Sequence, residues 1–274
     1  MAIAGRNELG ALGYAQVLAM AGRNTRNRSS YSGGRRRSQN GRETYRRARR
    51  PGGGQITATR ALIAINVLMY LVQMRYPPVT SAGWKMASAI TQKGQWYRLL
   101  TPVVLHGSVS HLMINSLSLN SVGPVIEQVM GKTKFMAVYI LAGISGNALS
   151  CIINPRMPAV GASGAIFGMV GAFGAFCLVN KSVLGRQNTE RALRGVGQTL
   201  ALNLVLGMSS TQIDNMGHIG GFLGGAATTL LIGPRLRRRT NPVTGEVYTV
   251  DLSPKLALPR FLKRATGRKE RRWP

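Results

Sequence analysis

The sequence predicts an all-α fold: a polytopic membrane protein built as a bundle of six transmembrane helices. Six apolar stretches lie between residues 61 and 233, and only one of them contains a charged residue. Glycines recur four residues apart in the last stretch, as they do where membrane helices pack closely. The basic residues gather at the two ends of the chain. An apolar centre between charged ends is typical of a protein embedded in a bilayer.

Charge divides the chain into three parts. The formal net charge is +28; residues 1–60 hold 13 Arg, and residues 235–274 hold 12 Lys and Arg. We therefore expect a basic disordered tail at 1–60, a membrane domain at 61–233 and a basic tail at 234–274. The first tail is acid-poor and contains Ser, which is the composition of an organelle transit peptide. The second is expected to form a small hairpin or to lie on anionic lipid headgroups.

The apolar stretches give the six predicted helices in order. The first, 61–74, would be about 21 Å long, short of a hydrocarbon core of about 30 Å. Arg60 and Tyr76 flank it and suit positions at the membrane surface. A stretch with two prolines and two tryptophans follows and suits an interfacial loop. The other helices are expected at 110–130, 135–153, 163–179, 195–208 and 215–232.

The positive charges of the short loops orient this bundle. With the N-terminus inside, loops 131–134 and 180–194 lie inside and carry six Lys and Arg in 19 residues. The loops on the other side carry five in more than 35 residues. The density of positive charge is therefore higher inside, as the positive-inside rule requires. On this topology the helices that carry Ser163 and His218 both start at the outer face.

Ser163 and His218 are the candidate catalytic residues. Each stands near the start of an apolar stretch, among glycines. A serine hydroxyl becomes a nucleophile when a neighbouring base accepts its proton, and an imidazole titrates near neutral pH. A helix N-cap is the simpler interpretation of Ser163 alone. A histidine within a bilayer, however, is costly and is usually functional.

Glycine spacing predicts how the two helices meet. Gly164 and Gly168 are four residues apart, as are Gly217, Gly221 and Gly225. Small residues at this spacing let helix axes come closer than the usual 8–10 Å or so. Ordinary membrane helix packing explains the glycines equally well. Together with the serine and the histidine, they predict two helices that bring a hydroxyl and an imidazole within reach of one proton.

His111 and Asn115 are candidate donors to an oxyanion. They are four residues apart and therefore lie on one face of the second predicted helix. Attack on an amide gives a tetrahedral oxyanion, which an imidazole N–H, an amide NH₂ and the backbone N–H of Ser163 can stabilise. The alternative is a polar pair that joins helices by hydrogen bonds.

The other polar residues of the membrane region have simpler expected roles. Asp214 could orient His218 as the acid of a triad, but a helix cap is its expected role, so a dyad is predicted. His106 is expected to form structural hydrogen bonds. The histidines lack the spacing of a zinc site, so no metal or cofactor is expected. Cys151 and Cys177 are expected to be buried thiols.

Four motifs together carry a family resemblance. They are Gly161-Ala-Ser163-Gly, His111-Leu-Met-Ile-Asn115, Gly217-His218-Ile-Gly-Gly and Gln95-Trp-Tyr-Arg98. In this order, over residues 60–233, they resemble the rhomboid intramembrane serine proteases. The resemblance implies Ser163 as the nucleophile and His218 as the base. It places His111, Asn115 and Gly161 at the oxyanion and substrate site, and it implies substrates that span the membrane once and are cut near the end of the span.

Residues 62–70 and 115–127 look most like the plant plastid-envelope branch of this family. Together with the basic N-terminal tail, this predicts a chloroplast envelope membrane, with a mitochondrial or other organelle membrane as the alternative. Residues 1–40 match nothing known in the family.

Other functions stay open. A catalytically silent rhomboid relative would bind membrane proteins without cutting them; such relatives usually lack the serine or the histidine, and this chain has both. Six apolar helices also permit a channel or transporter, although paired repeats with interrupted helices are not evident. The tails hold few aromatics, so nucleic acid is not expected as a partner. The expected partners are the lipid bilayer and transmembrane protein substrates.

Overall fold

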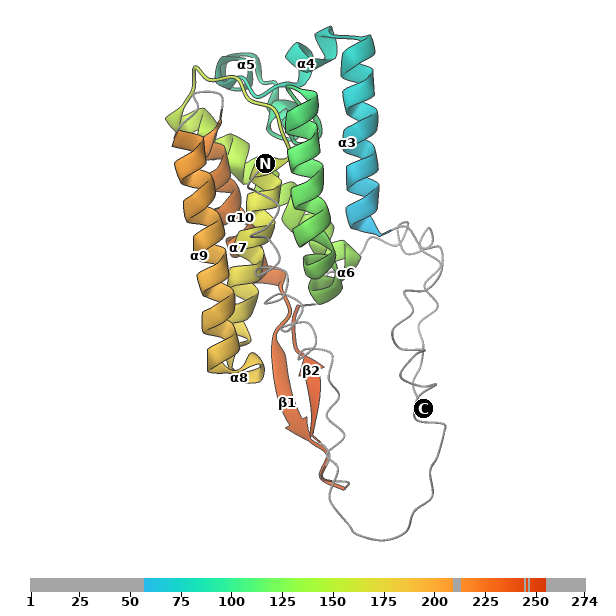
Figure 1. The fold of residues 1–274 in the computed structure, drawn as a ribbon, viewed down its shortest axis with the longest axis vertical. Helices are drawn as coiled ribbons and strands as arrows, with labels where there is room; N and C mark the ends of the chain where they lie inside the picture. Colours follow the sequence, from blue (N-terminus) through green and yellow to red (C-terminus); the bar gives the residue numbers. More distant parts are fainter. Residues whose placement is uncertain (1–56, 209–212, 244, 246, 255–274) are drawn as a thin grey trace.

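The computed structural model describes residues 57–208, 213–243, 245 and 247–254, which fold mainly as α-helices (Figure 1). The predicted tail 1–60 therefore lies almost entirely outside the described residues, as do residues 255–274 of the second tail. The long helices of the described chain are α3 Ala58–Arg75, α6 Val109–Ile153, α7 Ser163–Val179, α9 Arg186–Met208 and α10 Asn215–Ile232.

α6 consists of two helices joined at Gly131. This glycine has φ 75° and ψ 158°, which interrupts the helix. A straight helix of 45 residues would be about 67 Å long, twice the thickness of a bilayer core, whereas each half is about 33 Å long. The two halves run antiparallel. His111, near the start of the first half, lies against Gly161, and Ser150, near the end of the second half, bonds to Asp214 at the start of α10, so both ends lie at the same end of the bundle. They correspond to the predicted helices 110–130 and 135–153.

α7 is the central helix of the bundle. Every residue from Ala165 to Cys177 is buried, with α10, α6 and α9 packed around the helix (Figure 1). Its large side chains meet those of the second half of α6, for example Phe173 and Phe135 in the same buried core. Cys177 is buried as predicted, whereas Cys151 is half-buried, and both are free thiols. The predicted helix 163–179 has the same bounds as α7.

Glycines bring α10 very close to its neighbours. A Cβ added at Gly221 would lie 2.0 Å from the carbonyl oxygen of Gly164, and one at Gly225 would lie 1.9 Å from that of Gly168. On a neighbouring face of α10, a Cβ at Gly220 would lie 2.8 Å from the Ser145 carbonyl oxygen in the second half of α6. Any side chain at these positions would displace a backbone. The predicted close approach of helices 163–179 and 215–232 is confirmed.

α3 is attached to the bundle at its N-terminus by Glu127. One carboxylate oxygen accepts a hydrogen bond from the Ala58 N–H (2.8 Å), and the other accepts from the N–H and the hydroxyl of Thr59 (2.9 and 2.8 Å). These bonds satisfy N–H groups that the start of a helix leaves unpaired. Much of the remaining surface of α3 faces outward, with Leu68 61 % and Leu71 54 % exposed.

Exposed apolar side chains form a belt around several helices. Besides α3, they lie on α6, α9 and α10, and include Met113, Ile114, Leu117, Leu202, Val205, Leu223, Leu230 and Leu231. A surface of this kind suits contact with lipid. Among the described helices, α6 is the one that is long and apolar enough to cross a membrane by length and composition, and α7 is a shorter apolar helix. Six crossings therefore stay a prediction.

α9 starts well before the predicted boundary at residue 195. Its first turns are polar, and the Arg186 guanidinium donates to the Glu190 carboxylate one turn later (2.6 Å). A pair at this spacing supports a helix in water. A prediction that follows apolar residues alone therefore misses these turns.

The stretch between α3 and α6, predicted as an interfacial loop, contains short helices. They are α4 Pro78–Gly83, α5 Ala87–Lys93, η1 Trp96–Leu99 and η2 Thr101–Val104. The buried guanidinium of Arg98 donates to the carbonyls of Ser81 and Trp84 (2.9 and 3.0 Å) and holds these turns together. An antiparallel bridge joins Lys85 to Ala159, in the segment that leads to α7.

After α10 the chain forms an antiparallel hairpin of β1 Leu236–Thr240 and β2 Val247–Asp251, in which the first residue of β1 pairs with the last of β2. It extends from the end of the bundle where α7 ends and the short α8 Lys181–Leu184 follows (Figure 1). Asn180 ties it to the bundle, donating to the Pro234 carbonyl (3.0 Å) and accepting from the N–H at the start of β1 (2.6 Å). The hairpin alternative for the second tail is thus confirmed.

Candidate active site

Ser163 is the first residue of α7, and Ala162 occupies the N-cap position. The interpretation of Ser163 as the cap of this helix is therefore wrong. Gly161, with φ 134°, turns the chain into the helix and donates its N–H to the Pro102 carbonyl (2.9 Å). The N–H groups of a first helical turn have no partner within the helix. The backbone N–H of Ser163 belongs to this turn.

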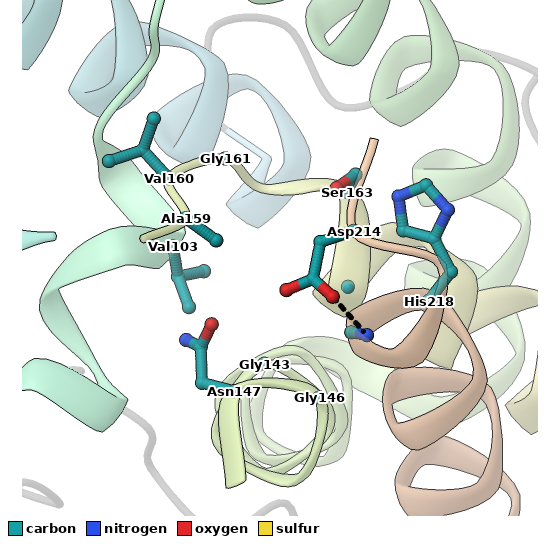
Figure 2. Close-up of a pocket in the computed structure, with 12 residues that line it drawn as sticks. Val103, Gly143, Gly146, Asn147, Ala159, Val160, Gly161, Ser163, Asp214 and His218 are labelled. Atoms are coloured by element: carbon teal, nitrogen blue, oxygen red, sulfur yellow. Dashed lines mark hydrogen bonds between the residues drawn. The ribbon is translucent and has the colours of Figure 1, made fainter. Parts of the chain in front are cut away.

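His218 lies in the first turn of α10, with 9 % of its surface exposed. Its ring stacks on that of Phe167, with centroids 4.3 Å apart and an angle of 9° between the planes. Phe167 is one turn after Ser163 and so lies on the same face of α7. The stack therefore holds the imidazole beside the helix turn that carries Ser163. Figure 2 shows a ring nitrogen of His218 on the side of the serine.

His111 and Asn115 lie against Gly161, as the prediction of a shared oxyanion site requires. A Cβ at position 161 would lie 2.7 Å from Cε1 of His111 and 3.6 Å from Nδ2 of Asn115. Glycine is needed here both for this close approach and for its positive φ. Nδ2 of Asn115 is buried and has no hydrogen-bond partner among the described residues. A buried donor without a partner is costly, so this N–H group is available to an incoming acceptor.

Asp214 is the N-cap of α10, the role that was expected of it. Oδ1 accepts from the N–H of Gly217 (3.0 Å), and Oδ2 accepts from the hydroxyl of Ser150 (2.5 Å). The backbone carbonyl of Asp214 accepts a hydrogen bond from the backbone N–H of His218 (3.1 Å). The carboxylate therefore orients the first turn of the helix and not the imidazole ring directly.

His106 is buried, and its backbone forms the structural hydrogen bonds. Its N–H donates to the Gln73 side chain and its carbonyl accepts from it, both at 3.0 Å. The ring of His106 packs edge-on against that of His111, with centroids 5.3 Å apart at 69°. This contact fixes the position of His111. Sequence reasoning missed Gln73 and Phe167, although Phe167 has the i, i+4 spacing from Ser163.

A small cavity of about 20 Å³ lies between these elements. Ser163, His218, Asp214, Gly161 and Asn147 are among the residues that line it (Figure 2). This is room for about one water molecule. The arrangement offers a hydroxyl, a base, N–H donors and space for a hydrolytic water. Within the described part of the chain, no group of three or more His, Cys, Asp or Glu is placed to hold a metal ion.

Comparison with known proteins now identifies the family. Residues 93–235, more than half of the chain, match the model of the Rhomboid domain. The chain belongs to the rhomboid family. Rhomboid membership makes it an integral membrane protein and, at the level of the family, supports intramembrane protease function.

Named relatives include proteases of Bacillus subtilis and plant proteins. Rhomboid protease GluP is 37% identical over 190 residues, which cover 66% of this chain and 36% of that protein. Putative rhomboid protease YdcA is 32% identical over 161 residues, covering 58% and 77%. RHOMBOID-like protein 5 of Arabidopsis thaliana is 35% identical over 138 residues, covering 50% and 44%. The chain thus spans about a third of GluP and less than half of the plant protein.

One further relative bears on catalysis. Inactive RHOMBOID-like protein 8 of Arabidopsis thaliana is 29% identical to this chain over 173 residues. Membership of the rhomboid family therefore does not by itself decide whether a chain is a catalyst. That decision depends on the residues at the site.

Proposed function

We propose that this protein is an intramembrane serine endopeptidase that cleaves single-span membrane proteins at or near the membrane. The observation that carries the proposal is the stack of His218 on Phe167, which holds an imidazole beside the turn that begins with Ser163. His218 accepts the proton of the Ser163 hydroxyl as the oxygen attacks the substrate carbonyl. The protonated imidazole then donates this proton to the leaving amine.

The oxyanion of the tetrahedral intermediate is stabilised at Gly161. The donors are the amide of Asn115, the imidazole of His111 and the backbone N–H of Ser163. The buried, unpaired Nδ2 of Asn115 supports this role, because an acceptor that arrives in the reaction removes the cost of its burial. In the second half of the reaction, a water deprotonated by His218 releases the acyl group from Ser163. The cavity beside these residues has room for such a water.

A membrane topology of six crossings belongs to the same proposal. The apolar belt on α3, α6, α9 and α10 and the break in α6 at Gly131 support it. Protease protection of tags placed in loops 131–134 and 154–162 tests it. The two tags are expected on opposite sides of the membrane, and protection of both on one side contradicts the topology.

We propose a chloroplast envelope membrane as the location, with another organelle membrane as the alternative. The support is the Arg-rich, acid-poor composition of residues 1–60. A fusion of residues 1–60 to a fluorescent protein, imaged in plant cells, tests this location. Import into chloroplasts is expected, and a diffuse cytosolic signal contradicts it.

Labelling by a fluorescent fluorophosphonate tests the catalytic proposal. The wild-type protein is expected to be labelled, and Ser163→Ala and His218→Ala are expected to remain unlabelled. Ser88→Ala, which changes an exposed serine of α5, is the matched control and is expected to label like the wild type. Co-expression with candidate single-span proteins, comparing the wild type with His218→Ala, then identifies substrates by their cleavage products.

A catalytically silent membrane-protein binder is the second candidate function. The observation that favours it is the similarity to a relative described as inactive. A folded, detergent-stable wild-type protein that does not react with the fluorophosphonate would support this function and overturn the first.

A further inference from the structure

A buried lysine lies next to the candidate active site. The side chain of Lys85 is 0 % exposed. Its ammonium donates to the hydroxyl of Ser150 (2.6 Å) and lies 3.6 Å from Oδ2 of Asp214. The Ser150 hydroxyl donates in turn to the same carboxylate oxygen (2.5 Å). A buried charge is costly unless it is paired and hydrogen-bonded, so these three side chains form one unit.

This unit ends at the helix turn that carries His218. Asp214 uses one carboxylate oxygen to cap α10 at Gly217 and the other to meet Ser150 and Lys85. His218 follows Gly217 directly, and its backbone N–H donates to the backbone carbonyl of Asp214. The position of the Lys85 ammonium therefore fixes the cap, and the cap fixes the first turn of α10.

The backbone of Lys85 meets the other half of the site. Its N–H donates to the carbonyl of Ala159 (2.9 Å), and its carbonyl accepts from the N–H of Ala159 (3.3 Å). Two residues later the same segment reaches Gly161, and then Ser163 begins α7. One residue thus holds the segment before the serine through its backbone and the turn with the histidine through its side chain.

We propose that Lys85 is a positioning residue of the protease, which sets the segment before Ser163 and the turn with His218 relative to each other. This assignment rests on the proposed function of Ser163 and His218. Lys85 acts on the site through its contacts with Ala159 and Asp214. A lysine is suited to this role because its ammonium can donate to Ser150 while it neutralises Asp214.

The test separates positioning from mere stability. Loss of one partner of a buried ion pair weakens a fold, so a lower total activity would not discriminate. Fluorophosphonate labelling of the full chain in detergent gives two independent quantities. The labelled fraction at completion reports how much protein is folded, and the rate constant at saturating probe reports how well the serine and the base are aligned in that fraction.

Three variants make the comparison. Lys85→Met keeps an unbranched side chain without its charge and leaves the Asp214 carboxylate unpaired. Lys85→Met combined with Asp214→Asn removes both charges and keeps a residue that caps helices well. Lys93→Met, which changes an exposed lysine at the end of α5, is the matched control.

Lys85→Met is expected to lower the saturating rate constant about tenfold or more, since a displacement of 1 Å costs on the order of 10²-fold. The probe concentration at half-maximal rate is expected to stay unchanged. The double variant is expected to recover most of the lost rate, and Lys93→Met is expected to label at the same rate as the wild type. A Lys85→Met protein that labels at the wild-type rate, even in a smaller folded fraction, overturns the assignment, as does a double variant no faster than the single one. A wild-type protein that does not label overturns the proposed function itself.

Discussion

Helices α3 and α7 are alike in length but occupy different surroundings. α7 is buried over all residues from 165 to 177, whereas α3 exposes more than half of Leu68 and Leu71. α7 contains four glycines, and α3 contains none. Glycine thus distinguishes the helix that is packed among its neighbours from the one that exposes large apolar side chains. The candidate catalytic residues lie on the glycine-rich pair α7 and α10.

The largest expected effect comes from filling the contact between α7 and α10. Gly225→Leu places a Cβ 1.9 Å from the Gly168 carbonyl oxygen, and no flexible side chain is there to move aside. We expect a loss of roughly 4 kcal/mol or more in stability, the size that only severe packing defects reach. Thermal unfolding in detergent measures it. Gly195→Leu on α9, where a Cβ meets nothing within 4 Å, is the control, and equal melting of the two variants would refute the difference.

Gly161→Ala tests the crowded end of α7 at the site itself. The new Cβ would lie 2.7 Å from the His111 ring at a φ of 134°, which side chains rarely adopt. We expect fluorophosphonate labelling to slow about 10²-fold, because the ring must shift by a sizeable part of 1 Å. Gly94→Ala has a positive φ of 66° but open space, so it isolates backbone strain and should label normally. Similar labelling of both variants would contradict a role for this contact.

Glu127→Gln tests how α3, with so little of its surface buried, stays attached. The carboxylate accepts three hydrogen bonds from Ala58 and Thr59, and an amide oxygen cannot replace both carboxylate oxygens. We expect a loss of about 1–3 kcal/mol from the donors left unsatisfied. Thermal unfolding measures it, with Glu190→Gln in an exposed pair as control. A stability equal to that of the control would mean that α3 is held by its apolar contacts.

The smallest effect is expected on the outward face of α3. Leu71→Ala should change stability in detergent by less than about 0.5 kcal/mol, as surface substitutions usually do. Met169→Ala on α7, at a side chain 0 % exposed, should cost about 2–5 kcal/mol. The pair of melting temperatures sharpens the contrast between the helices. A large loss of stability in Leu71→Ala would contradict the exposed position of this side chain on α3.

The apolar pattern predicted the helices well because burial and lipid contact select the same residues. The predicted bounds of α7 and α10 coincide with those observed, and the loop predicted at 131–134 falls at the break in α6. The start of α9 was missed because an exposed charged turn has no apolar signal. The short helices before α6 were missed because they are fixed by tertiary bonds such as those of Arg98.

The sequence motifs predicted those residues of the candidate site that belong to the motifs. Ser163, Gly161, His111 and Asn115 lie together, but the supporting residues were not foreseen. Lys85 lies in the stretch that was expected to be an interfacial loop, and an isolated lysine in such a stretch gives no sign of burial. Its burial depends on Asp214, more than a hundred positions away in the chain, and such a pairing has no local pattern.

The glycines of α10 that face both α7 and α6 have a mechanical consequence. With α7 and the second half of α6 both packed closely against its glycines, α10 has little freedom to slide or rotate against α7. Ser163 and His218, which lie on these two helices, then move together. In the proposed protease, any rearrangement that admits a substrate would therefore occur in other helices, while Ser163 and His218 keep their mutual alignment.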